Sequence, residues 1–192
     1  MNYSKVIIRP AEERDIPRIG ELLREICDLH ADGRPDLFNH GGRKYSDKEL
    51  SVLLGDATRP IWVATADGSD VLGYAFGIIK STSGEGALRE CKTLYIDDLC
   101  VDRQVRGGGI GRRLFEFCRD KARDMGCHNL TLNVWAFNSS AIEFYEKMGM
   151  KVQSMHMETV FADKGEEEEK VTENGYDRYP TISIHSGCPP FR

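Results

Sequence analysis

Residues 101–113 read VDRQVRGGGIGRR, a run in which four glycines and several arginines follow an apolar stretch and precede a helical pattern. Glycines between a strand and a helix expose backbone N–H groups at the positive end of the helix dipole, where a phosphate or pyrophosphate is stabilised. Arg106, Arg112 and Arg113 add positive charge to an otherwise acidic chain. We therefore expect an anion site here in preference to a glycine-rich turn with solvated arginines.

The spacing of the glycines excludes the two common nucleotide motifs. A Walker loop ends in Gly-Lys-Ser/Thr, which this run lacks. The dinucleotide pattern GxGxxG fails as well, because its third glycine would fall on Arg112 or Leu114.

Apolar periodicity outlines the elements on either side of this run. Strands are expected at 5–9, 60–66, 71–80, 93–101, 130–134 and 151–161, and 30–45 is expected to be a loop. Helices are expected at 16–26, from the Ser46/Glu49 capping box to near Gly55, at 110–125 before Gly126, and from the N-cap Asn138 to Gly149.

Length and composition bound the class of protein. The 192 residues suggest one domain, with a core at 1–161 and an acidic, flexible or edge-packing tail at 162–192. Seven acidic and four basic residues in the tail carry −3 of the net charge of −5, which argues against nucleic acid and anionic membranes as partners. The six cysteines show no paired spacing, and the sequence suggests neither a membrane span nor a signal peptide. We therefore expect a reduced, cytoplasmic protein.

Two spaced motifs resemble the GNAT superfamily of N-acetyltransferases. Arg106-x-x-Gly109-x-Gly111 looks like the family's motif A, which binds the pyrophosphate of acetyl-CoA. The run Asn138-Ser-Ser-Ala141-Ile-Glu-Phe144-Tyr145, with Gly149 soon after, is similar to its second motif. The resemblance covers about 5–161 and implies an α/β (α+β) fold with a central mixed, mostly antiparallel sheet flanked by helices.

The resemblance also implies how acetyl-CoA, the expected co-substrate, would be held. A bulge would splay the 93–101 strand from its neighbour and free its backbone to pair with the pantetheine arm and polarise the thioester carbonyl. The expected cofactor-binding residues are Leu99, Cys100, Val101, Arg106, Gly107, Gly108, Gly109, Ile110, Gly111, Arg112, Asn138 and Ser140.

Three residues are candidates for catalysis. Tyr145 resembles the family's general acid, which protonates the departing CoA thiolate, although it could also be a core tyrosine. Asp97 and Asp98 are expected to orient the amine or accept its proton, but adjacent strand residues face opposite sides unless a bulge rotates one of them. A structural carboxylate is the competing interpretation for at least one of them.

The function expected from these residues is transfer of an acetyl group to a primary amine by direct attack in a ternary complex. The acceptor would be a polyamine-like small molecule, an aminoglycoside-like amine or a protein N-terminus. The alternatives are a non-catalytic CoA-binding sensor or scaffold module, and an enzyme that uses a longer acyl donor. His128 and His156 lack metal-ligand spacing, so no metal is expected. The sequence leaves open whether the protein is a homodimer.

Overall fold

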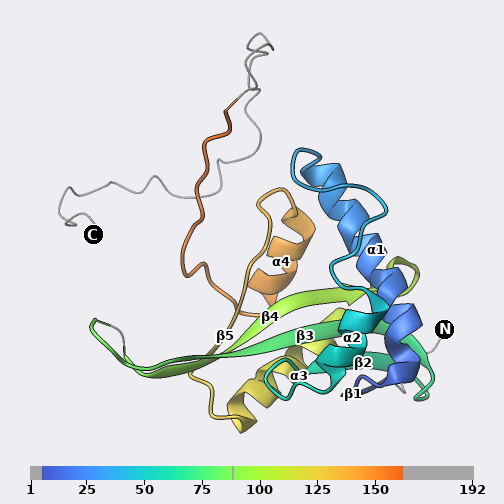
Figure 1. The fold of residues 1–192 in the computed structure, drawn as a ribbon, viewed down its shortest axis with the longest axis horizontal. Helices are drawn as coiled ribbons and strands as arrows, with labels where there is room; N and C mark the ends of the chain where they lie inside the picture. The colour runs from blue at the N-terminus through green and yellow to red at the C-terminus, as the bar shows by residue number, and fades with distance from the viewer. Residues whose placement is uncertain (1–5, 88, 162–192) are drawn as a thin grey trace. The chain divides into compact units, whose positions relative to one another are not determined.

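The computed structural model describes residues 6–87 and 89–161, whose strands form one mixed sheet in the order β1-β2-β3-β4-β5 (Figure 1). β1 to β4 pair antiparallel, and β5 is parallel to β4. The strands are β1 (Val6–Pro10), β2 (Ile61–Ala66), β3 (Asp70–Thr82), β4 (Cys91–Val101) and β5 (Asn129–Leu132). The α-helices are α1 (Ile16–Gly33), α2 (Asp47–Leu54), α3 (Ile110–Asp124) and α4 (Ser139–Lys147), with short 3-10 turns η2 (Glu13–Asp15) and η3 (Arg103–Val105). This is the expected mixed sheet flanked by helices.

Two apolar layers cover the sheet, one on each face. On one face, α1 and α2 pack against strand residues such as Tyr74 and Phe76. On the other face, α3 packs against residues such as Leu94 and Ile96, and the apolar side of α4 joins this layer. A strand residue that contacts one layer therefore faces away from the other. The layer that a side chain contacts thus shows which face of the sheet it lies on.

Local signals set several helix ends where the sequence predicts them. Ser46 accepts a hydrogen bond from the Glu49 N–H while the Glu49 carboxylate accepts one from the Ser46 N–H, which is a complete capping box. The Asn138 side chain caps α4 by accepting from the Ala141 N–H at 3.1 Å. α1 is longer than expected, because the predicted loop at 30–45 begins only after Gly33.

The bulge expected in β4 is present. Phe76 of β3 lies opposite Asp98, and its neighbour Gly77 lies opposite Ile96, so Asp97 is the extra residue of the bulge. β4 pairs with β5 only as far as Ile96. From Asp97 to Val101, β4 thus has its strand neighbour on the β3 side alone within the described residues, which leaves the edge toward β5 open.

The predicted strand at 151–161 is wrong. The structure assigns no strand to these residues, and the side chains from Lys151 to Phe161 are exposed. Alternating apolar residues indicate which face of a strand would be buried, but a strand also needs a partner that supplies hydrogen bonds. The compact unit ends at Lys151, and the described residues after it belong to a second unit.

The predicted tail at 162–192 lies outside the described residues, so the boundary at 161 stays a prediction. Across 6–87 and 89–161, no helix has the length and apolarity needed to cross a bilayer.

Candidate active site

The β4 bulge brings Asp97 and Asp98 to the same face of the sheet. Leu94 and Ile96, before the bulge, contact the α3 layer, whereas Cys100, after it, contacts the α1 and α2 layer. Regular alternation would have kept these three residues on one face, so the bulge reverses the pattern between Ile96 and Asp98. Both carboxylates consequently point toward α1 and α2.

Asp97 is held by residues of the segment between α1 and α2. Tyr45 donates its hydroxyl to Asp97 Oδ2 at 2.9 Å, and Lys44 Nζ lies 2.8 Å from the same oxygen. Arg59 donates to the Tyr45 hydroxyl, also at 2.9 Å, and the Tyr45 ring stacks on Phe76. Asp97 is thus neutralised by a lysine and fixed by a tyrosine in the structure described here.

Asp98 is more strongly desolvated than Asp97, and among the described residues its side chain has a tyrosine hydroxyl but no lysine as a direct partner. The buried Tyr74 donates its hydroxyl to Asp98 Oδ2 at 3.1 Å. Burial raises the pKa of Asp98 to about 6, against the opposing effects of the Lys44 charge and the Tyr74 hydrogen bond. A carboxyl with such a pKa can exchange a proton near neutral pH, which is what a group that receives a proton from an amine needs.

The glycine loop has the backbone geometry of an anion site. Gly107 and Gly109 have φ values of +82° and +78°, in the left-handed region that other residues avoid, and Gly109 is the N-cap of α3. A Cβ at either position would meet no atom within 4 Å, so the space beside the loop is open. The first N–H groups of α3 have no acceptor within the helix and point toward this loop.

The arginines do not all gather at the loop as predicted. Arg106 donates from Nε to the Val101 carbonyl at 3.0 Å, which ties the loop to the end of β4. Arg112 pairs with Glu116 one turn along α3, at 2.9 Å, and Arg113 reaches the Val6 carbonyl of β1. Side chains on successive helix positions point in different directions, so consecutive arginines could not share one spot. The loop's backbone donors and Arg106 still form a set that suits a pyrophosphate.

Tyr145 lies on the α3 side of the sheet, within the aromatic packing of that layer. Its ring contacts Phe144 and Phe115 at centroid distances of 5.1 and 6.0 Å. Burial raises the pKa of Tyr145 far above its ordinary value, and the Asp98 charge raises it further. Tyr145 is therefore both a packed aromatic, as one interpretation held, and a phenol that stays protonated, as a general acid must.

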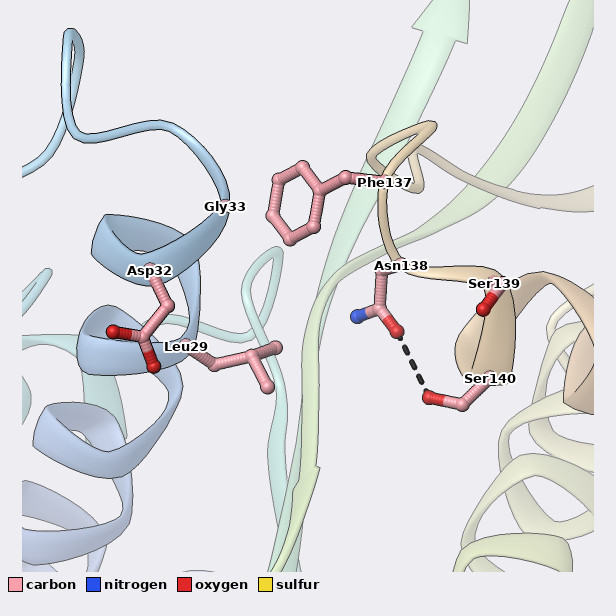
Figure 2. Close-up of a pocket in the computed structure, with 7 residues that line it drawn as sticks. All are labelled: Leu29, Asp32, Gly33, Phe137, Asn138, Ser139 and Ser140. Carbon is pink, nitrogen blue, oxygen red and sulfur yellow. Dashed lines mark hydrogen bonds between the residues drawn. The ribbon is translucent and has the colours of Figure 1, made fainter. Parts of the chain in front are cut away.

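The start of α4 faces the end of α1 across a pocket. The pocket is lined by Leu29, Asp32, Gly33, Phe137, Asn138, Ser139 and Ser140. Figure 2 shows the residues of α1 on one side and those of the α4 start on the other, with the Ser140 hydroxyl bonded to Asn138 Oδ1 at 3.0 Å. Asn138 and Ser140 were both expected near the cofactor, and the structure brings them together at this pocket.

Sequence reasoning placed His30 in the loop that usually forms part of the acceptor pocket in this family, whereas the structure places it in α1. Other residues of this region were missed by sequence reasoning. His30 and Phe38 join Trp135 and Phe137 in an aromatic cluster that links the end of α1 to the segment before α4. Tyr74 and Tyr45 belong to no motif. Tyr74 of β3 lies opposite Cys100 of β4, a register that the sequence does not report. Tyr45 precedes the N-cap Ser46, where an apolar residue commonly packs on the helix, and this position was its only signal in the sequence.

Cys100 does not behave as a nucleophile. Its side chain is buried, and burial raises the pKa of its thiol to about 12. The five cysteines of the described ranges are all free. No group of three or more His, Cys, Asp or Glu side chains in those ranges is arranged to hold a metal ion.

Known proteins of one acetyltransferase family are similar to this chain in sequence. The chain matches the acetyltransferase (GNAT) family over residues 23–150. It is 32% identical over 133 residues to the peptidyl-lysine N-acetyltransferase YjaB of Salmonella typhimurium, covering 69% of this chain and 77% of that protein. It is 37% identical over 120 residues to the glucosamine 6-phosphate N-acetyltransferase of Arabidopsis thaliana, covering 62% and 70%.

Among solved structures, a tetramutant of the BH1408 protein from Bacillus halodurans superimposes with a TM-score of 0.77 and 28% identity, over 81% of this chain and 99% of that one. The curated relatives differ in the acceptor that their names specify, while the acetyltransferase activity is common to them. The chain belongs to the acetyltransferase (GNAT) family, and it is an N-acetyltransferase of the kind that uses acetyl-CoA as its co-substrate.

Proposed function

We propose that the protein transfers the acetyl group of acetyl-CoA to a primary amine that is cationic in solution, by direct attack in a ternary complex. The observation that carries this proposal is the position of Asp97 and Asp98 on one face at the β4 bulge. Two carboxylates there favour a positively charged acceptor. The relatives named for peptidyl-lysine acetylation support an alkyl amine of this kind.

The donor side of the proposal rests on the open edge of β4 and on the glycine loop. The pyrophosphate of acetyl-CoA would bind the N–H groups of 107–111 with help from Arg106, and the pantetheine arm would run along Leu99, Cys100 and Val101. Asn138 and Ser140 would contact it from the α4 side. In this arrangement a backbone N–H of β4 would polarise the thioester carbonyl.

Proton transfer would be divided between two residues. An unperturbed alkyl amine has a pKa near ~10.4, so it must lose a proton before it can attack. Asp98 would accept that proton, directly or through water, because its pKa of about 6 leaves it ionised at neutral pH. Asp97 would bind the cationic acceptor once Lys44 has moved aside, and Tyr145 would donate a proton to the thiolate that leaves. We also propose that the protein is cytoplasmic, because the spacing of its cysteines shows no pairing and disulfides are rare in that compartment.

The test combines product identification with one variant. Purified protein would be incubated with acetyl-CoA and a panel of polyamines, aminoglycosides and peptides, with thiol release and the mass of each amine as readouts. We expect one acetylated amine per CoA released, and a Tyr145→Phe variant that binds CoA normally but turns over far more slowly. Tight CoA binding without acetylation of any amine would instead indicate a non-catalytic binding module. Full activity of Tyr145→Phe would refute the role of Tyr145 as the general acid.

A further inference from the structure

Lys44 places a primary ammonium group at Asp97, the neighbour of Asp98 on β4. Its Nζ lies 2.8 Å from Asp97 Oδ2 and donates to the Asp97 carbonyl oxygen at 3.3 Å, so it reaches both polar ends of the bulge residue. The ammonium also stands 5.6 Å from the centre of the Tyr45 ring. Its charge lowers the pKa of Asp98 as well, which shows that it acts on both carboxylates.

The chemistry of this group is that of the acceptor in the proposed function. Lys44 carries an unbranched alkyl chain that ends in a primary amine, and that amine occupies the carboxylate pole where a cationic acceptor would bind. The stretch of β4 that would receive the thioester arm, Leu99 to Val101, begins one residue past Asp98 on the edge that β5 leaves open. The amine is thus a ligand of this site supplied by the chain itself.

The ion pair does not lock the lysine in place. The Lys44 side chain is 43% exposed, and an ion pair whose lysine has that much solvent access adds little to stability. The side chain can therefore leave Asp97 and return. An amine tethered next to a reacting centre has a high effective concentration there, which favours its reaction over that of amines elsewhere on the surface.

We propose that Lys44 is itself acetylated by this protein, as an intramolecular acceptor. The inference rests on the proposed function, because it uses the same donor and the same site. The Lys44 ammonium gives up one proton to Asp98 or to water, and the neutral Nζ attacks the carbonyl carbon of the acetyl thioester. A C–N bond forms and the C–S bond breaks. The sulfur leaves with a proton from Tyr145, and the second proton of the nitrogen passes through water to restore the Tyr145 phenol. The net products are acetyl-lysine, CoA thiol and the one proton given to Asp98 or water.

The experiment uses the full chain with acetyl-CoA and no added amine. Intact mass would follow the gain of one acetyl group per chain, and peptide mapping would assign it. Lys48 is the matched control, since it is exposed and lies four residues further on, in the first turn of α2. We expect Lys44 to be acetylated at least about tenfold faster than Lys48, at a rate per chain that does not depend on protein concentration. Lys44→Arg should abolish the rapid phase, and Tyr145→Phe should slow it.

Two results would overturn the inference. Equal rates at Lys44 and Lys48, or a Lys44 rate that Tyr145→Phe leaves unchanged, would indicate ordinary chemical acetylation by the thioester. A parallel reaction with an added alkyl amine separates this failure from that of the proposed function. Acetylation of the added amine without acetylation of Lys44 would refute only the inference, whereas acetylation of neither would refute both.

Discussion

The replacement Asp98→Asn should stabilise the protein while it removes activity. Asparagine keeps the size of the side chain and an oxygen that can accept the Tyr74 hydroxyl, but it carries no charge. The native carboxylate is ionised at neutral pH in a place where burial raises its pKa to about 6. The protein therefore pays a free-energy penalty for this charge, and the amide avoids it.

The size of the effect follows from the difference between the two pKa values. An unfolded aspartate titrates near 3.8, so the folded value of about 6 lies roughly two units higher. At about 1.4 kcal/mol per unit this corresponds to roughly 3 kcal/mol, and the residual solvent access of a half-buried side chain reduces it to about 2 kcal/mol. Because the folded state holds the proton more tightly, the penalty is absent below pH 3.8, develops as the pH rises and is complete above pH 6.

Urea denaturation of both proteins between pH 4 and pH 8 measures this difference directly. We expect the free energies of unfolding to agree at the acid end and to diverge up to about 2 kcal/mol in favour of Asp98→Asn above pH 6. Asp97→Asn is the matched control, because Asp97 is paired with Lys44 and its loss should cost up to about 1 kcal/mol. A variant at Asp98 that is destabilised across the range, or a difference independent of pH, would refute the reasoning.

Three further changes test other parts of the site. Tyr145→Phe should lower kcat by a factor on the order of 10² or more with the affinity for CoA unchanged, and an equal fall in CoA affinity would argue for a packing role. Asn138→Ala should cost about 1 kcal/mol of stability through the lost cap, whereas Asn138→Asp should keep most of it in the same urea assay. Gly73→Ala should cost about 2 kcal/mol or more, since its Cβ would lie 2.6 Å from the Cys100 carbonyl oxygen. Gly55→Ala, which meets only an ordinary contact, should change stability by less than about 0.5 kcal/mol, and similar losses at both glycines would contradict the β3–β4 register.

The parts of the fold that sequence could predict are those fixed by local chemistry. Ser46 with Glu49 and Asn138 with the Ala141 N–H satisfy helix ends by contacts within a few residues, so their patterns are visible in the sequence. The glycine loop is equally local, because its backbone conformation demands residues without a Cβ.

The rest depends on contacts between distant parts of the chain. Asp97 is bound by Tyr45 and Lys44, about fifty positions earlier, and no spacing in the sequence reports such a meeting. Asp98 depends in the same way on Tyr74 from the neighbouring strand. The segment 151–161 shows the converse error, since an apolar pattern suggested a strand without any knowledge of a partner for it.

A crystal structure with a bisubstrate analogue, an alkyl amine joined to the CoA sulfur through an acetyl link, tests the central claim most directly. We predict that the pyrophosphate will bind the N–H groups of 107–111 and that the sulfur will lie beside the Tyr145 hydroxyl. The amine nitrogen should lie within about 3 Å of the Asp98 carboxylate or of one water bound to it. An amine directed away from the β4 bulge, or a pyrophosphate bound elsewhere, would contradict the site described here.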